Sequence, residues 1–265
     1  MSFLLFSLPA AVIPALILVV YFVRSDKYPE PFSMLLKTFL YGVFIVIPVL
    51  IMGGVFEFLG ELLNVKEDVL SSALFDAFPL AAIPEELFKF WVLSAICAKS
   101  SEFDEPMDGI VYGAVASLGF ATLENIMYVS GGGLGVALVR AFTAVPAHAA
   151  FGAIMGYYFS KVYFQGGRVS LTSRAYFVPM MLHGLYDFSL FYMVGISNQY
   201  EHTENMSDGE AFLVLGSMIM FFVVFVHTIR RANRYLKEMR QEQEAKSHLV
   251  HTEHFKCVEK QNPVR

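Results

Sequence analysis

The sequence has little charge and very few cysteines. Of its 265 residues only 16% are charged and 56% are hydrophobic, whereas a soluble domain carries about 25% charged residues. The two cysteines, Cys97 and Cys257, do not form a CxxC pair, so the sequence indicates neither a disulfide framework nor a thiol redox motif. The formal net charge of −5 gives no support to nucleic-acid binding. Together these shortages exclude most soluble classes and favour a membrane protein.

The hydrophobic residues fall into long continuous runs. A helix of about 20 apolar residues is needed to cross a hydrocarbon core of about 30 Å. We therefore predict an all-α polytopic protein of the cell (inner) membrane, in contact with lipid, with about seven transmembrane helices. The first run starts at Phe3 without a basic segment before it, which favours a spanning helix over a cleaved signal peptide. The predicted spans lie near residues 3–23, 38–60, 73–97, 108–129, 134–159, 175–196 and 211–229.

Lysine and arginine in the loops indicate how the chain is oriented. These residues stay preferentially on the cytoplasmic side of a membrane, and they gather in the first, third and fifth loops and after the last span. The second, fourth and sixth loops contain only Lys66. We therefore predict that the N-terminus lies outside and the C-terminus lies in the cytoplasm. Residues 1–230 should form the transmembrane domain, and residues 231–265 a basic, partly disordered tail, whose three histidines are His248, His251 and His254.

Ionisable side chains occur where the hydrocarbon core should be. Each costs a few kcal/mol near the bilayer centre, about 2.5–3.5 on an insertion scale. Glu85 and Lys89 are four residues apart, so they share a helix face, and His183 and Asp187 have the same spacing. So many costly residues in four consecutive spans predict a shared polar cavity. The set is Glu85, Glu86, Lys89, Glu124, Arg140, His148, His183 and Asp187.

Six members of this set are candidate catalytic residues, because carboxylates and imidazoles activate water or bind a metal. They are Glu85, Glu86, Glu124, His148, His183 and Asp187. Structural roles compete with this interpretation. Glu86 with Lys89 forms a neutral pair, Arg140 suits an interfacial or ion-pairing residue, and a lone His148 is more often a satisfied buried histidine. The catalytic hypothesis therefore depends on the set.

Prolines and glycines add information about the helices around this set. Pro84, Pro146 and Pro179 precede the candidate residues closely, and each frees a backbone carbonyl that protein or a water-filled cavity must satisfy. Proline is also simply commoner in membrane helices. Two glycine pairs, Gly109 with Gly113 and Gly152 with Gly156, predict close packing of two helices.

Four short motifs occur in order over residues 84–187. They are Glu85-Glu86-x-x-Lys89, Phe120-x-x-x-Glu124, the single His148, and His183-x-x-x-Asp187. The set resembles the EExxK, FxxxE, histidine and HxxxD motifs of the PrsW family of intramembrane proteases. That family belongs to the superfamily of CAAX prenyl endopeptidases and bacteriocin-processing enzymes. The resemblance covers the motif core alone, and nothing is carried over to the first two spans, the last span or the tail.

The resemblance implies an intramembrane endopeptidase that hydrolyses a peptide bond of a membrane-anchored protein. Family members include bacterial enzymes that make the first cut in an anti-sigma factor, so an anti-sigma factor or a similar protein is the implied substrate. In the prenyl-processing relatives the first glutamate of the first motif positions the attacking water, which assigns Glu85 as the base. Those relatives often have histidine and asparagine where this chain has Glu124 and Asp187.

The cofactor therefore stays open at the level of sequence. A metal-free mechanism can use Glu85 as base and a protonated neighbour as donor. Alternatively, Glu124, His148 and His183 can bind a divalent metal such as zinc, which polarises water and the carbonyl. At a rise of about 1.5 Å per residue, the candidate residues lie from the outer third to just past the middle of the membrane. We therefore expect cleavage near the extracytoplasmic boundary of the substrate.

A proton- or ion-coupled transporter is the alternative function, because carboxylates at the membrane midplane also form proton relays. We see no inverted repeat of interrupted helices, which many transporters have. Other intramembrane proteases fit poorly, because the sequence has no HExxH and no GxSxG. It also lacks the GxGD that accompanies a Tyr-Asp pair in aspartyl enzymes.

Overall fold

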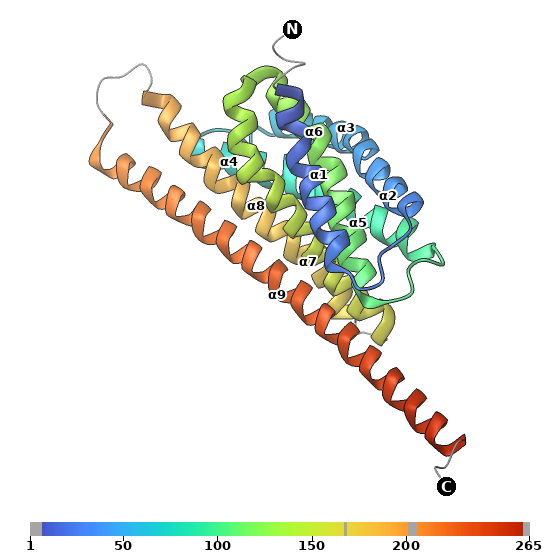
Figure 1. Cartoon of the computed structure of the whole chain (residues 1–265). Coiled ribbons are helices and arrows are strands. Elements are labelled where there is room, and N and C mark those ends of the chain that lie inside the picture. The colour runs from blue at the N-terminus through green and yellow to red at the C-terminus, as the bar shows by residue number, and fades with distance from the viewer. Residues whose placement is uncertain (1–6, 167–168, 201–205, 262–265) are drawn as a thin grey trace.

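Helices form nearly all of the chain that the structure describes (Figure 1). The structure, a computed structural model, describes residues 7–166, 169–200 and 206–261, and no β-strand occurs within those ranges. The predicted all-α fold is therefore confirmed. In chain order the helices are α1 (Leu8–Ser25), α2 (Phe32–Phe44), α3 (Val46–Leu62), α4 (Val69–Phe75), η2 (Asp76–Ala82), α5 (Ile83–Trp91), η3 (Val92–Ile96), η4 (Cys97–Lys99), α6 (Pro106–Phe142), α7 (Ala144–Gln165), α8 (Val169–Tyr200) and α9 (Asp208–Gln261).

The predicted spans all overlap helical stretches. α6 leaves helical geometry at Gly133, where φ is 67°, and the chain turns back there, so two predicted spans share one stretch (Figure 1). The polytopic membrane fold is confirmed, while the number of crossings and the orientation stay predictions. Among the described residues, five stretches are long and apolar enough to cross a membrane: Leu8–Ser25, Phe32–Leu62, Pro106–Gln165, Ser173–Gln199 and Asp208–Ser247.

The predicted span near 73–97 is helical but irregular, and it is not one of those five stretches. The wide π-helical turns η2 and η3 flank the short α5, and a 3₁₀ turn, η4, ends the segment. Pro79 lies inside η2 and Pro84 in the first turn of α5. Proline has no N–H and cannot complete the regular hydrogen-bond ladder, and π-helical turns are frequent at functional sites.

Close glycine contacts hold the centre of the bundle together. A Cβ atom at Gly156 would collide with the carbonyl group of Gly109, and one at Gly113 would collide with that of Gly152. The predicted close approach of these helices is therefore confirmed for α6 and α7. α2 is pressed against α6 in the same way, because a Cβ atom at Gly42 would collide with the carbonyl of Ala116. The buried core follows these contacts along α6 and α7.

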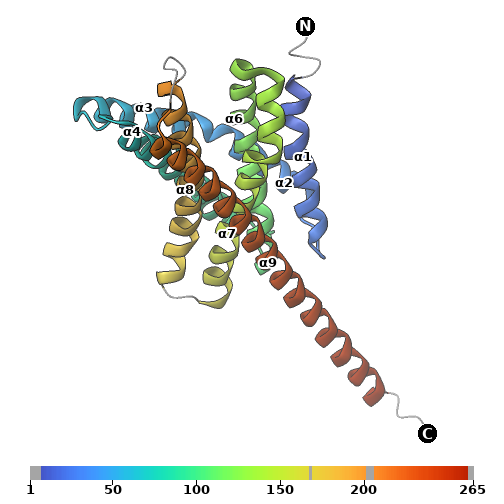
Figure 2. The same cartoon turned by 90° about the vertical axis from the view of Figure 1, so that its left-hand side faces the viewer.

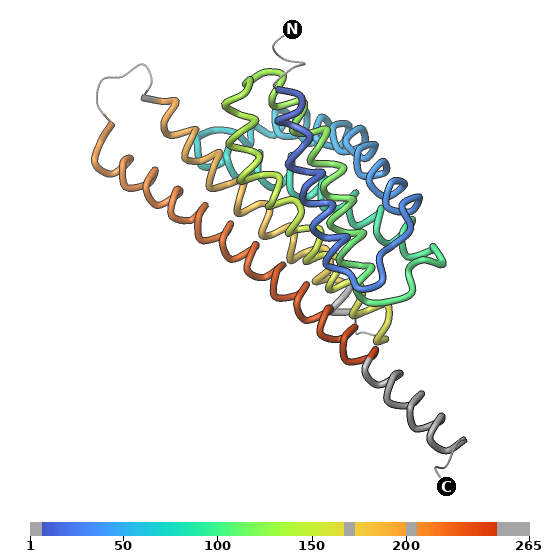
Figure 3. The backbone as a smooth tube through the Cα atoms, in the orientation of Figure 1, coloured from blue at the N-terminus to red at the C-terminus, as the bar shows by residue number. Residues whose placement is uncertain are grey.

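α9 is one long helix that passes the predicted domain boundary at residue 231 without a break (Figure 3). Beyond that boundary it packs on α7, where the rings of Tyr157 and Tyr235 stack with centroids 3.7 Å apart, and Lys161 donates to Glu242 at 2.6 Å. The two-region division and the partly disordered tail stay predictions. The side chains of His248, His251 and His254 lie outside the described residues.

Candidate active site

Four helices bring the six candidate residues together. α5 carries Glu85 and Glu86, and α8 carries His183 and Asp187, one helical turn apart. α6 contributes Glu124 and α7 contributes His148. Glu85, Glu86, His148 and His183 are all buried, and Glu86 has no exposed surface. The predicted shared polar cavity is therefore a real cluster at the centre of the bundle.

Glu86 and Lys89 form the innermost ion pair of the cluster. The Lys89 ammonium donates to Glu86 Oε1 at 2.8 Å and to Glu85 Oε2 at 3.2 Å. It also lies 3.1 Å from His148 Nδ1, and because an ammonium has only donors, this nitrogen accepts. Its Nζ atom is 4.6 Å from the ring centroid of Phe120. Lys89 therefore does more than neutralise its own helix, since it also binds a side chain of α7.

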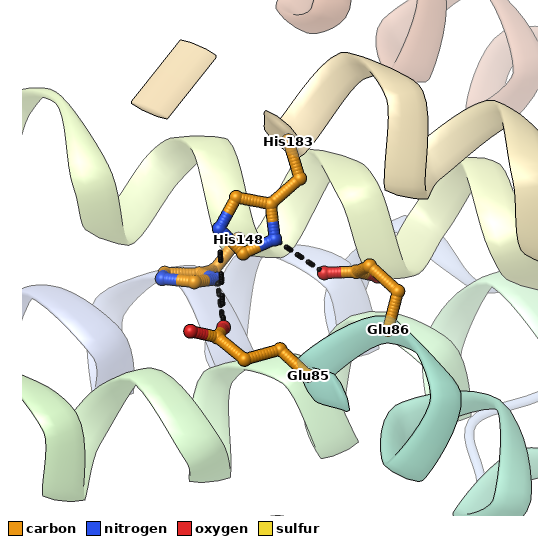
Figure 4. A group of neighbouring side chains, drawn as sticks. All are labelled: Glu85, Glu86, His148 and His183. Atoms are coloured by element: carbon orange, nitrogen blue, oxygen red, sulfur yellow. Dashed lines mark hydrogen bonds and ion pairs between the residues drawn. The ribbon is translucent and has the colours of Figure 1, made fainter. Parts of the chain in front are cut away.

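The Glu85 carboxylate faces both imidazoles (Figure 4). Its Oε2 atom is 4.0 Å from His148 Nδ1 and 3.9 Å from His183 Nε2. The two imidazole rings meet edge to face with centroids 5.1 Å apart. These separations exceed a hydrogen-bond distance, and the Lys89 ammonium bridges the first of them, because it contacts both Glu85 Oε2 and His148 Nδ1.

His148 is oriented by a chain of polar contacts. Because its Nδ1 accepts from Lys89, its Nε2 carries the proton and donates to Glu124 Oε2 at 2.9 Å. Arg140 donates to the same Glu124 oxygen at 2.6 Å and to Asn125 Oδ1 at 2.9 Å. The interpretation of Arg140 as an ion-pairing residue is therefore confirmed. The Arg140 guanidinium compensates the charge of Glu124 and fixes the carboxylate against the ring.

His183 is held between two carboxylates. Its Nδ1 lies 2.9 Å from Glu86 Oε1, and its Nε2 lies 3.1 Å from Asp187 Oδ2. The ring of Phe151 stacks on it with centroids 4.9 Å apart and planes 20° apart. The polar contacts set the direction of the ring nitrogens, and the phenyl ring prevents the imidazole from tilting. His183 is consequently a rigid group that faces Glu85.

The cluster fits a divalent metal ion by its donor atoms. Each of Glu85, Glu86, His148 and His183 offers one oxygen or nitrogen, and these four atoms lie within 4.8 Å of one another. Histidine nitrogens and carboxylate oxygens are the ligands of catalytic zinc. In addition, the buried Glu86 Oε2 finds no hydrogen-bond partner among the described residues. Lys89 contacts three of these side chains, so its ammonium and a metal compete for the same donors.

This donor group differs from the metal set that the sequence suggested. Glu124 was expected to join His148 and His183 around the ion, but it contacts the far nitrogen of His148 and the guanidinium of Arg140. Glu85 and Glu86 of α5 offer their carboxylate oxygens to the donor group instead. The physical reason is that Arg140 lies next to Glu124 once the chain has turned back at Gly133, so this carboxylate has its own cation.

Several contacts around the cluster were not foreseen from the sequence. Phe120 was expected to wall the cavity, and it does so beside His148, with ring centroids 5.8 Å apart. The stacking of Phe151 on His183 was missed, although Phe151 lies three residues after His148 and so shares its helix face. The bridge from Lys89 to His148 was also missed, because no sequence spacing relates α5 to α7.

The amino-acid sequence matches a family model described as PrsW family intramembrane metalloprotease over residues 30–228. This match contains all six candidate residues and most of the helical bundle. It favours a membrane peptidase over the alternative of an ion-coupled transporter. No solved structure matches the chain.

Curated proteins named Protease PrsW are similar to this chain over most of its length. The one from Geobacillus kaustophilus (strain HTA426) is 40% identical over 188 residues, which cover 68% of this chain and 78% of the relative. The one from Bacillus subtilis (strain 168) is 41% identical over 184 residues, 68% of this chain and 81% of the relative. The one from Oceanobacillus iheyensis is 32% identical over 228 residues, 85% and 95%.

Proposed function

The chain belongs to the PrsW family of intramembrane metalloproteases, and we propose that it hydrolyses its substrate with water activated by Glu85. Family membership makes it a membrane peptidase with a protein substrate. We further propose that it works in the cell (inner) membrane and that its substrate is an anti-sigma factor or a similar membrane-anchored protein. The observation that carries the mechanism is the position of Glu85, whose carboxylate faces His148 and His183 across gaps of 4.0 and 3.9 Å.

In this proposal Glu85 is the general base. Its carboxylate takes a proton from water while the water oxygen attacks the carbonyl carbon of the peptide. The negative oxygen that forms accepts hydrogen bonds from a cationic or N–H donor, and Lys89 and His183 are the donors beside Glu85. The same proton then passes to the leaving amine as the carbon–nitrogen bond breaks. Asp187 and Glu86 position His183, and Glu124 positions His148.

Glu86, His148 and His183 would hold the metal of the family, and Glu85, whose carboxylate faces both imidazoles, would stay free beside them as the base. When bound, a divalent ion polarises water and the peptide carbonyl as a Lewis acid. The donor types and their closeness support this assignment. Binding would draw Glu86 and His148 away from Lys89, which now contacts both.

The proposal is tested by comparing membrane-protein fragments from cells with the wild-type chain and with Glu85→Gln. The glutamine keeps the shape of the side chain but removes the base, so we expect cleavage to fall by about 10²–10⁴-fold. His183→Ala should also abolish cleavage while the protein stays inserted. Glu102→Gln, in the loop before α6, is the matched control and should cleave like the wild type. Turnover by Glu85→Gln at the wild-type rate would refute the assignment.

The fragments also test the finer parts of the proposal. Mass spectrometry of the new termini locates the cut, which we expect near the extracytoplasmic boundary of the substrate. An anti-sigma factor among the fragments that depend on Glu85 would support the substrate class. Fragments only from other proteins, or a cut in the cytoplasmic half of the substrate helix, would contradict the corresponding part.

A further inference from the structure

A cavity of about 530 Å³ leads to the candidate active site. Glu85 and Glu124 lie in its wall together with Phe120, Met127 and Tyr128 of α6. The opposite wall is formed by η2 and by α3. The cavity is the place where a peptide can reach Glu85, because it joins the buried carboxylates to the outside of the bundle.

α3 covers this cavity with a single face. Its lining residues include Val46, Leu50, Gly53 and Glu57, which recur every three or four residues and so lie on one side of the helix. The other sides of α3 expose large apolar side chains, with Phe58 65% exposed. In Figure 2, α3 and α4 project to one side of the bundle, away from α1. α3 therefore separates the cavity from the surrounding lipid as a single layer.

The two halves of the stretch 32–62 are held very differently. α2 is clamped on α6, because a Cβ atom at Gly42 would meet the backbone of Ala116, and one at Gly119 would meet that of Phe39. Along α3, by contrast, a Cβ atom at Gly54 would meet nothing within 4 Å. Only Val46, Val49 and Gly60 of α3 are buried. A fixed helix thus continues into a loosely held one.

α2 and α3 meet at Ile45, whose ψ of −11° departs from regular helix geometry. Its N–H donates to the carbonyl of Tyr41, and its carbonyl accepts from Val49. Pro48 has no N–H, so the carbonyl of Phe44, four residues earlier, loses its helical donor. Missing hydrogen bonds of this kind are where helices bend. This junction is therefore the point at which α3 can hinge on α2.

Lys66 holds the other end of α3 closed. Its ammonium pairs with Glu57 of α3 at 2.8 Å and with Asp76 of η2 at 2.8 Å. Glu57 and Asp76 both line the cavity. Gly60 also lies against the ring of Phe75. These contacts are partly exposed, and exposed ion pairs contribute only about 0–1 kcal/mol, so the closure is weak enough to open.

We propose that α3 is a hinged gate, closed by Lys66, through which the transmembrane segment of a single-pass protein passes from the lipid into the cavity beside Glu85. This inference rests on the proposed function, since it names the route by which the substrate reaches that site. The largely apolar walls suit a membrane-embedded segment, and Gly54, where a Cβ atom would meet nothing within 4 Å, leaves room for its main chain in the cavity. A soluble peptide would need a polar path instead.

The motion of α3 is tested without a substrate, by spin labels in lipid nanodiscs. Cys97→Ala and Cys257→Ser remove the native thiols. One label replaces Val139 of α6, and the second replaces either Phe58 on α3 or Leu36 on α2, all of them exposed. We expect the Phe58–Val139 distance to show a second population that grows in Lys66→Met. The Leu36–Val139 distance should stay single and unchanged. A single Phe58–Val139 distance that Lys66→Met does not alter would overturn the gate.

The occupant of the cavity is tested by cross-linking in the inactive Glu85→Gln chain. The probe is a synthetic single-pass peptide with a Leu/Ala transmembrane segment, flanking lysines and a central benzophenone. We expect cross-links to cavity residues such as Leu50 and Leu80, and we expect Gly54→Leu to abolish them by filling the space. Gly216→Leu on α9, where a Cβ atom also meets nothing within 4 Å, is the matched control and should retain them.

The two tests separate the gate from the proposed function. Both measurements are independent of turnover, so a chain that hydrolyses nothing can still show a moving α3 and an occupied cavity. Conversely, a chain that cleaves membrane proteins but cross-links the peptide only on its lipid-facing surfaces would refute the gate alone. Cavity cross-links that Gly54→Leu leaves unchanged would also refute it.

Discussion

At the scale of single residues, Lys89 is the centre of the polar cluster. It is 1% exposed and binds two carboxylates and an imidazole. A cation in this position lets Glu85 and Glu86 lie side by side inside a membrane protein, where unpaired charges are expensive. The sequence suggested a structural pair of Glu86 with Lys89, and the ion pair at 2.8 Å agrees with that role. The contact with His148 adds a link between helices.

The first prediction concerns the replacement of this lysine. Lys89→Gln removes the cation but leaves the buried carboxylates, and breaking a buried ion pair in this way costs about 3–5 kcal/mol. We therefore expect a lower yield and a lower midpoint of thermal unfolding in detergent, followed by the fluorescence of Trp91. Lys99→Gln, at the exposed last residue of η4, is the control. Equal midpoints for the two variants would show that Lys89 is not structural.

At the scale of helices, the pairing of α6 with α7 sets the distance between Glu124 and His148. The two glycine pairs let the backbones touch, since every added Cβ atom in them would collide with the opposite helix. His148 Nε2 then lies 2.9 Å from Glu124 Oε2. A small increase in the helix separation would break this contact. The glycines therefore serve the site as well as the fold.

The second prediction is that Gly156→Ala destabilises the protein. The new methyl group would press on the carbonyl of Gly109, and overpacking of this kind costs about 1–3 kcal/mol. Gly135→Ala lies in α6, at a position where a Cβ atom meets nothing within 4 Å, so it should be neutral or slightly stabilising. Thermal unfolding of both variants measures the difference. A drop in the midpoint for both would contradict the packing argument.

A second contact between helices contains a carboxyl group whose ionisation should change the stability of the protein with pH. Gln243 of α9 donates to Asp26, after α1, at 2.7 Å and also to Glu105, before α6. Burial raises the pKa of the Glu105 carboxyl from 4.5 to about 7 and also raises the pKa of Asp26. The folded chain therefore keeps a proton on Glu105 over a pH range in which the unfolded chain has lost it.

The third prediction follows from the sign of this difference. Because the folded state binds the extra proton, the contribution of Glu105 to stability is greatest below about pH 4.5 and falls as the pH rises to about 7. Glu105→Gln cannot ionise and keeps an acceptor for Gln243, so its unfolding midpoint should depend less on pH in that window. Glu102→Gln should show the wild-type dependence. Identical pH profiles for all three proteins would contradict the assignment.

At the scale of the whole molecule, the arrangement of the chain ends bears on the orientation. α1 begins at the end of the bundle where α6 turns back, and α9 runs to the opposite end (Figure 1). An odd number of crossings has this property. The basic residues that follow the last predicted span, starting with Arg230, lie on the part of α9 that leads toward this opposite end, which is predicted to be cytoplasmic.

The fourth prediction tests this orientation with fused reporters. A reporter placed after residue Glu201 should be extracytoplasmic, and one placed after Arg240 should be cytoplasmic. The physical reason is the absence of lysine and arginine from the sixth loop and their abundance after the last span. Accessibility of each reporter to a membrane-impermeant reagent gives the answer. Finding both on the same side would refute the seven-span prediction.

The sequence by itself determined the helical membrane fold and the identity of the candidate residues. Long apolar runs can only be helices in a bilayer, because backbone groups there must bond within their own segment. Ionisable residues in four of these runs had to share a cavity for the same energetic reason. The glycine pairs also indicated that helices approach closely at these positions, although not which helix meets which. Each of these features depends on residues close together in the chain, so the spacing of residue types in the sequence predicts it.

Only the tertiary structure decided which charges meet. Glu124 turned toward Arg140 and His148, Lys89 crossed to His148, and the side chains of α5 became the metal-binding candidates. The weakly held α3 and the π-helical turns beside Glu85 were likewise invisible in the sequence. Each depends on distances between helices far apart in the chain, or on a competition between several donors for one acceptor. Hydrophobic periodicity gives no information on such distances or on such competition, because both are decided by the packing of the whole bundle.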